Sequence, residues 1–590
     1  MSLQAACQDY VPGESDLILV GLGEQLDSGS VEDAVQLLLQ DKYKSILVDL
    51  GWDLLSLLTL RLPVDETDLR WSLVDKIVEL GSPKEMCLAV LEQMDSLSMM
   101  DKTAAVLNML SPLQKALLQA PNAAIVTSTL HSVYRLIEKC CPQLTMVERD
   151  TDVGDEDIEH SYDNAATEDQ IDCNFFAMSN QVLTFIRPFV DRMHVMATQP
   201  EVLFPNHKLA VNVLLLDQLR KQKIECLAIL LCLLDYPLVS CCYGTEGKTD
   251  QVLATRARNV AESIMGLITQ CHYGCIHLLS PSPPWPRVGL ASFAHLLLVE
   301  EIMISYLPVV LSQQFLLSLC LAHVITLLER PETTTVVLKG LALLESAVGR
   351  VEKNSLPLVA LENKQYINLA NVITKVMVSC SDKTARQRSV SLLMRLIHIF
   401  TADGRHKLYS HLLHTVCHGG VVGLLVHSVK NEVDTALKGA SMLTASPFLG
   451  ESLGPLLNKI FTLSPDTQLM EEMDRVMAAL NFLRYLLIGD TQERNETGVW
   501  GIRSHLHTSF VAPVRQLLTS TKMVCRQEME AAREEKGQRA KDGPEVCVEV
   551  AGETLPKLSE KEELQMLEVV GNHMDMLESV LVRVEELLEH

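Results

Sequence analysis

The chain has 590 residues, a formal net charge of −25 and 16 cysteines; 48% of its residues are hydrophobic and only 5% are aromatic. This length exceeds what one hydrophobic core fills, so we expect several domains or one long array of repeats. The negative charge repels phosphate backbones and anionic lipid headgroups, which argues against nucleic acid and membrane surfaces and favours a basic protein partner. Much leucine and few aromatics favour helices over sheets.

The cysteines are scattered without CxxC pairs, and the N-terminal residues lack the basic segment and apolar run of a signal peptide. Disulfides are rare in reducing compartments, where a free cysteine is usually a small buried hydrophobe. We therefore expect a cytoplasmic protein with free, mostly buried thiols.

The first part of the chain, residues 1–147, is predicted to be a helical subdomain. Apolar residues spaced by three and four predict short helices over residues 31–40, 46–60, 69–80 and 84–94. An acidic stretch follows over residues 148–170, in which ten acidic residues between Glu148 and Asp169 accompany the single basic residue Arg149. Such a composition predicts a solvated linker or loop.

Helical patterning resumes over residues 171–289 and ends in a proline-rich loop around Trp285, which cannot be regular helix. Residues 302–328 contain no charged side chain and are long enough to span a bilayer. However, Pro308 divides them and several polar side chains interrupt them, which is costly in hydrocarbon. We predict a pair of helices buried on both sides there, with no membrane span.

The remaining residues, 290–590, are predicted to form a C-terminal HEAT-like region. Their repeating unit is a helix pair of roughly 35 to 45 residues without a repeated letter motif, which is typical of irregular HEAT or armadillo arrays. The predicted fold is therefore an all-α, irregular helical-repeat solenoid. A short extended piece over residues 546–550 and a final helix over 560–589 complete the chain.

The most informative stretch is residues 473–500. Four apolar residues recur at helical spacing and predict one buried face: Val476, Leu480, Leu483 and Leu487. The opposite face is mixed and suits contact with a partner, although packing on a neighbouring helix is an equal alternative. We assign a protein-binding role to Asp474, Asn481, Arg484 and Tyr485 on this helix, and to Trp500 after it.

The chain end offers a second candidate binding surface. Between Glu545 and His590, twelve acidic residues accompany only three basic ones, which favours a positively charged partner. Three glutamates of the final helix represent this surface: Glu578, Glu585 and Glu589.

Short matches to enzyme and metal motifs are weak. Gly450-Glu451-Ser452-Leu453-Gly454 matches a nucleophile elbow, and His418-Gly419-Gly420 matches an oxyanion motif, but no strand precedes either. Gly247-Lys248-Thr249 lacks the first glycine of a phosphate-binding loop, because Cys242 occupies that position. Cys271, His272, Cys275 and His277 fall within seven positions, whereas structural zinc uses two separated ligand pairs. We predict no catalytic residue, cofactor or metal.

Several blocks, ordered along essentially the whole chain, resemble the glomulin family of FKBP-associated inhibitors of cullin–RING ubiquitin ligases. They are GWDLL at 51–55, LPVVLS at 307–312, VVLKGLALLESAVGRVEKNSL at 336–356, DRVMAALNFLRYLL at 474–487, ETGVW at 496–500 and ESVLVRVEELLE at 578–589. The resemblance weakens over residues 271–287 and 537–544, and it implies a polar tail beyond His590.

The resemblance implies a non-enzymatic protein whose C-terminal half binds the RING domain of the RING-box subunit and excludes the ubiquitin-conjugating enzyme. It also implies links to an FKBP-type immunophilin, to the hepatocyte growth factor receptor and to vasculogenesis. From the residues alone, without the resemblance, we infer only an acidic binding protein built from helical repeats. The alternative from another functional class is an assembly scaffold that bridges protein partners without inhibition.

Overall fold

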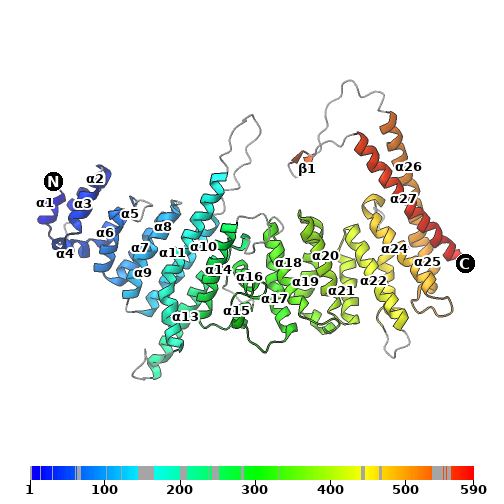
Figure 1. Cartoon of the computed structure of the whole chain (residues 1–590), viewed down its shortest axis with the longest axis horizontal. Coiled ribbons are helices and arrows are strands. Elements are labelled where there is room, and N and C mark those ends of the chain that lie inside the picture. Colours follow the sequence, from blue (N-terminus) through cyan, green and yellow to red (C-terminus); the bar gives the residue numbers. More distant parts are fainter. Residues whose placement is uncertain are drawn as a thin grey trace. The chain divides into compact units, whose positions relative to one another are not determined.

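The structure is a computed structural model. It describes residues 3–12, 15–28, 31–59, 61–62, 68–100, 102–120, 122–143, 165–198, 209–236, 238–241, 251–280, 285–330, 333–439, 446–463, 468–534, 549–550, 553–554 and 560–589. Helices make up nearly all of the regular structure in these ranges (Figure 1). The predicted all-α helical-repeat fold is confirmed.

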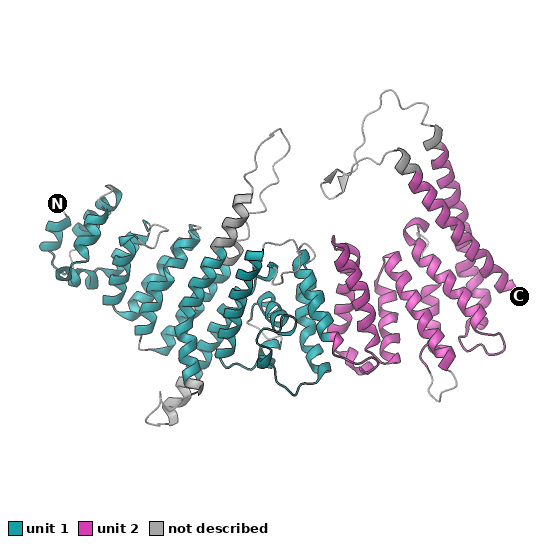
Figure 2. Cartoon of the chain, viewed as in Figure 1, with its two compact units in different colours: residues 1–347 teal, residues 348–590 magenta. Residues whose placement is uncertain are grey.

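The chain divides into two compact units, residues 1–347 and 348–590 (Figure 2). This division falls inside helix α18 (Thr334–Gly349). The subdomain boundaries that composition placed at 147, 170 and 289 stay predictions. Of the acidic stretch, residues 148–164 lie outside the described residues, as do residues 242–250 and 281–284, whereas residues 165–169 belong to helix α11.

Unit 1 is a stack of helices in which α16 packs against α17, the next long helix along the chain, whereas α10 packs against α13, which follows α11 in the sequence. Its helices before α18 are α1 (Leu3–Gln8), α2 (Asp16–Ser28), α3 (Val31–Leu38), α4 (Lys44–Asp49), α5 (Gly51–Thr59), α6 (Leu69–Leu80), α7 (Pro83–Met99), α8 (Thr103–Asn108), α9 (Leu110–Gln119), α10 (Ala123–Gln143), α11 (Ala165–Thr198), α13 (Leu209–Leu233), α14 (Gln251–Gln270), α15 (Cys275–Leu279), α16 (Arg287–Leu298) and α17 (Gln313–Leu328), with the short helical turns η1 (Asp41–Tyr43), η3 (Leu238–Ser240) and η4 (Ile304–Tyr306).

Two helix predictions in unit 1 are corrected. The helix expected over residues 46–60 is divided into α4 and α5 at Leu50, whose φ of −106° and ψ of 10° leave the helical range. The expected pair over 302–328 is a single helix, α17, because residues 307–312 form a loop in which Pro308 has no N–H to donate. Val309 and Val310 are fully exposed in this loop.

No helix in the described part of the chain is both long enough and apolar enough to cross a membrane. Helix α17 is buried on nearly all sides, which explains its uncharged sequence. The described cysteines are free, and nearly all of them are buried, as predicted. Trp285, at the end of the proline-rich loop, is also buried.

Unit 2 contains a second stack of helices. Its elements after α18 are η5 (Leu358–Glu362), α19 (Gln365–Ser379), α20 (Lys383–His398), α21 (Ala402–Thr415), α22 (Gly419–Gly439), η6 (Gly450–Ser452), α23 (Gly454–Ile460), α24 (Leu469–Gly489), η7 (Val499–Ile502), α25 (Arg503–Leu506), the π-helical turn η8 (His507–Val511), α26 (Ala512–Glu534), β1 (Glu549–Val550), β2 (Glu553–Thr554) and α27 (Glu560–Glu589). Strands β1 and β2 pair antiparallel, with Glu549 opposite Thr554, at the end of the segment predicted to be extended.

A buried ion pair fixes helix α22, the neighbour of α24. The Arg405 guanidinium on α21 donates to both carboxylate oxygens of Glu432 on α22, at 2.8 and 2.9 Å. The same guanidinium donates to the Phe400 carbonyl at 2.8 Å and to the Asn354 side chain. Because both charges are largely buried, each depends on the other for compensation. The network therefore holds α22 in a fixed position beside α24.

Candidate protein-binding surface on helix α24

Helix α24 has the two faces that its sequence predicts. Val476, Leu480 and Leu483 are fully buried, and Leu487 is 5% exposed. The helix ends at Gly489, and Asp490 caps it through a backbone N–H bond to the Leu486 carbonyl. The predicted core face and the predicted stop are both confirmed. The opposite face is where a partner could make contact.

That outer face carries an exposed stripe, which Met477 and Ala478 interrupt because they are half-buried. Asp474, Asn481 and Arg484 are exposed, as a binding surface requires. The stripe also includes Met470 and Ile488, whose side chains are 49% and 58% exposed. Sequence reasoning missed these two residues, although extending the same helical spacing in both directions from Asp474 and Asn481 would have found them.

Tyr485 lies at the edge of the stripe, against α22. Its hydroxyl donates to the Asp434 carboxylate at 2.7 Å, and the Lys430 ammonium lies 5.5 Å from its ring centroid. Partial burial, together with the hydrogen bond to Asp434, raises the pKa of Tyr485 to about 12. The sequence left two alternatives for this face, contact with a partner and packing on a neighbouring helix. Tyr485 packs on the neighbouring helix α22, whereas Asn481 is exposed.

Helices α22 and α24 approach closely because glycines line their contact. A Cβ atom on Gly419 would lie 2.5 Å from the Glu471 carbonyl oxygen, and one on Gly423 would lie 3.0 Å from the Asp474 carbonyl oxygen. His418-Gly419-Gly420 thus stands at a helix–helix contact rather than at an oxyanion site. The two helix backbones therefore lie in close contact at Gly419 and Gly423.

Trp500 has a structural role in the loop after α24. Its indole N–H donates to the Asp490 carbonyl at 2.9 Å. The Asp490 carboxylate is buried and accepts from the Thr497 N–H and hydroxyl, at 2.8 and 2.7 Å. These bonds satisfy a buried carboxylate and fix the loop against the helix end. Trp500 is still partly exposed, so a contact with a partner stays a prediction.

The glutamates of α27 are divided between internal ion pairs and solvent. Glu585 accepts from the Arg515 guanidinium on α26 at 3.0 Å, and Glu578 accepts from Lys522 at 2.6 Å. The hydrogen bond to Glu585 raises the pKa of Arg515. Glu589 is exposed. Part of the acidic charge that we predicted to attract a partner is therefore already neutralised by ion pairs between α26 and α27.

The described residues bring together no group of three or more histidine, cysteine or acidic side chains that could hold a metal ion. Cys271 and Cys275 are buried, and burial raises the pKa of both thiols, which keeps them protonated. The Gly450–Gly454 segment forms the turn η6 at the start of α23, and the described residues directly before it, 446–449, form no strand. It lacks the strand-to-helix geometry of a nucleophile elbow.

Comparison with known proteins covers most of the chain. The sequence matches the family described as "Uncharacterised protein family, YAP/Alf4/glomulin" over residues 22–202 and 297–579. It is 28% identical to Glomulin from Homo sapiens over 609 aligned residues, which cover 99% of this chain and 95% of the human protein. It is also 28% identical to Glomulin from Mus musculus, over 98% of this chain and 94% of the mouse protein.

Proposed function

The chain belongs to the YAP/Alf4/glomulin family, and from this premise we propose that it is a non-enzymatic inhibitor of cullin–RING ubiquitin ligases. In this proposal it covers the RING domain of the RING-box subunit on the surface that the ubiquitin-conjugating enzyme uses. The two proteins then exclude each other, and ubiquitin transfer stops without any chemistry on the inhibitor. Similarity to Glomulin over nearly the whole chain supports a shared role.

The exposed stripe of α24 is the observation that carries the proposal. Protein interfaces combine a few apolar anchors with polar groups that fix orientation. Met470 and Ile488 supply the anchors, and Asp474 and Asn481 lie between them on the same face. Arg484 adds a side chain that is enriched at interfaces. No rearrangement is needed to expose this surface.

Helix α27 packs against α24, and we propose that its exposed end adds to the same interface. We assign Glu578 and Glu585 to holding α27 on α26, since both carboxylates already accept from cations. Glu589 is exposed and supplies negative charge at the rim. Rim charges change the rate of association more than the affinity. A basic RING partner would therefore associate more slowly at higher ionic strength.

A reconstituted ubiquitination assay tests the proposal. The full-length protein should suppress ubiquitin-chain synthesis, and an excess of the conjugating enzyme should restore it. Met470→Ala and Ile488→Ala should each weaken inhibition by about tenfold, the loss typical of an interface anchor. Met99→Ala is the matched control, because Met99 is 79% exposed on α7 in the other unit. Inhibition that excess conjugating enzyme cannot relieve would contradict the competition.

The same assay separates the inhibitor from the assembly scaffold. A scaffold would bind the ligase and leave chain synthesis unchanged. Tyr485→Phe serves as a further control, because it removes only the hydroxyl that donates to Asp434. It should retain inhibition, since that hydroxyl is directed at α22 and not at the stripe.

A further inference from the structure

The N-terminal end of unit 1 carries a high negative charge. Residues 1–59 contain ten acidic side chains and only two basic ones, Lys42 and Lys44. The Lys44 ammonium pairs with the Asp41 carboxylate at 2.8 Å, and the Lys42 ammonium lies 4.5 Å from the centroid of the Tyr43 ring. Both lysines are therefore engaged by their immediate neighbours. The remaining acidic side chains give this end of the chain a negative potential that attracts cations.

Trp52, in the first turn of α5, lies on the surface of this acidic end. Helix α5 has a fixed orientation, because its inner side is fully buried at Leu54, Leu55 and Leu58. This orientation leaves Trp52 on the outer side with 40% of its surface exposed. The other three tryptophans of the chain are buried or half-buried: Trp71, Trp285 and Trp500. Trp52 is thus the one tryptophan whose indole ring is largely open to a partner.

Two carboxylates flank Trp52 in the sequence. Asp49 is the last residue of α4, three positions before it, and Asp53 follows it directly on α5; both are exposed. The Asp49 carboxylate accepts a hydrogen bond from the Tyr10 hydroxyl at 3.5 Å, and this neutral donor leaves its charge in place. Within the described part of the chain, neither carboxylate forms an ion pair. An exposed indole therefore lies between two carboxylates that have no cation of their own.

This combination of groups selects one kind of side chain. A cation above the face of an aromatic ring is attracted by the ring electrons, and tryptophan gives the strongest attraction. A guanidinium is planar, so it can stack on the indole while its N–H groups bind a carboxylate in pairs. A lysine ammonium supplies the charge but has no plane to stack. Val48, which is 51% exposed, adds an apolar contact for the neighbouring part of the ligand.

We propose that the Trp52 surface, formed by Val48, Asp49, Trp52 and Asp53, binds an arginine-bearing segment of a partner protein. One guanidinium stacks on the indole of Trp52, and its N–H groups donate to the Asp49 or Asp53 carboxylate. Tryptophan and arginine are the residues that most often anchor protein interfaces, and here each supplies one side of the contact. The Trp52 surface belongs to unit 1 and shares no residue with the α24 stripe of unit 2.

Fluorescence polarisation on the full-length protein provides the test. The probes are fluorescein-labelled ten-residue peptides with two arginines and one leucine among glycine and serine, and matched sets with lysine or with citrulline, the neutral analogue of arginine. Arginine peptides should bind about tenfold more tightly than citrulline peptides and about threefold more tightly than lysine peptides. Trp52→Leu should weaken the arginine peptides about fivefold. This variant keeps the charge of the protein, so general attraction between the acidic chain and a basic peptide cannot explain such a loss.

Asp53→Asn and Asp33→Asn form a matched pair, because each removes one exposed carboxylate from the acidic end and only Asp53 belongs to the Trp52 surface. Asp53→Asn should weaken arginine peptides about fivefold, and Asp33→Asn less than twofold. The proposal is overturned if no peptide binds, if citrulline peptides bind as tightly as arginine peptides, if Trp52→Leu binds like the wild type, or if the two asparagine variants act alike. All variants should still inhibit ubiquitin-chain synthesis, which separates this proposal from the function assigned to α24.

Discussion

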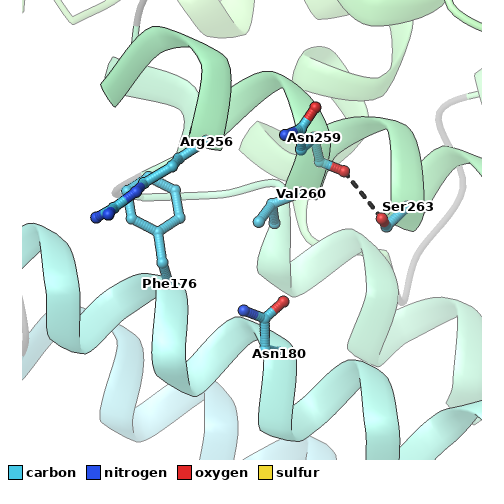
Figure 3. Close-up of a pocket in the computed structure, with 6 residues that line it drawn as sticks. All are labelled: Phe176, Asn180, Arg256, Asn259, Val260 and Ser263. Atoms are coloured by element: carbon cyan, nitrogen blue, oxygen red, sulfur yellow. Dashed lines mark hydrogen bonds between the residues drawn. The ribbon is translucent and has the colours of Figure 1, made fainter. Parts of the chain in front are cut away.

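Two pairs of neighbouring helices, α22 with α24 in unit 2 and α11 with α14 in unit 1, pack side by side but leave different surfaces. In the first pair, Gly419 and Gly423 let the helices approach until a Cβ atom at Gly419 would lie 2.5 Å from the Glu471 carbonyl oxygen. In the second pair, Phe176 and Arg256 lie along the contact, and a pocket of about 380 Å³ remains (Figure 3). Its lining comes from two residues of α11 and four of α14: Phe176, Asn180, Arg256, Asn259, Val260 and Ser263.

The size of the residues along each contact decides what that surface can bind. Without side chains on Gly419 and Gly423, α22 packs closely against α24, and the exposed residues of α24 lie on a helix that its neighbour holds tightly. An exposed stripe along a firmly held helix suits the face of a folded domain. A pocket of this size admits only a small ligand or one or two side chains. The two units therefore offer different kinds of binding surface although both are stacks of helices.

The largest expected difference between the two units is in stability, and it concerns the side chains beneath these surfaces. Leu483 is fully buried in unit 2, and Leu483→Ala should lower the free energy of unfolding by about 2–5 kcal/mol, as large-to-small core changes do. Val260 borders the pocket of unit 1, so water can replace the methyl groups that Val260→Ala removes, and the cost should be about 1 kcal/mol. Denaturant unfolding followed by hydrogen exchange in each unit measures both. Equal losses would mean that the pocket is closed in solution.

The glycine contact is tested by adding one carbon atom. Gly419→Ala should cost about 1–3 kcal/mol, because the new Cβ meets backbone that cannot rotate away. Gly439→Ala is the matched control on the same helix, since no atom of the described residues lies within 4 Å of its Cβ position. Thermal melting of the two variants checks the difference. A neutral Gly419→Ala would show that α22 and α24 separate readily and that their shared surface is not fixed.

Helical periodicity correctly predicted the features that depend on one helix alone. Val476, Leu480 and Leu483 recur at 3.6-residue spacing, so their common burial follows from the sequence. The outcome for Tyr485 depends on Asp434, which lies 51 positions earlier on another helix. Amphipathic spacing identifies a face as polar but not the neighbour that covers it. From the sequence alone, it was therefore impossible to tell that α22 covers Tyr485 and leaves Asn481 exposed.

Charge counting could not reveal the internal ion pairs of the final helix for the same reason. Glu578 and Glu585 contribute to an acidic stretch in the sequence, but their partners Arg515 and Lys522 come from α26. The pocket in unit 1 could not be predicted either, since Asn180 and Asn259 are 79 positions apart in the sequence. Such sites arise from the packing of distant helices, and no local pattern records them.

The smallest expected effect is pH-dependent and lies on the same helix pair as the pocket, beyond the end of α14. His194 and His272 form a hydrogen bond of 2.9 Å with stacked rings, and Lys223 donates to the His272 carbonyl at 3.3 Å. Partial burial, then the charges of His194 and Lys223, lower the pKa of His272. A histidine with a lowered pKa adds stability above about pH 6.5 that is lost as the pH falls below it.

His272→Asn removes this titration without straining the backbone, because His272 has a φ of 49° and asparagine tolerates that conformation. Both histidines are exposed, so the effect should stay below about 0.5 kcal/mol. Hydrogen exchange at pH 7.5 and 5.5, corrected for intrinsic rates, should show about a twofold loss of protection over residues 190–198 and 268–276 in the wild type. His272→Asn should abolish that loss, and His194→Asn should reduce it, because partial burial and Lys223 still act on His272. If the variants lose protection as the wild type does, the acid sensitivity lies elsewhere, and this end of the α11–α14 pair is held by packing alone.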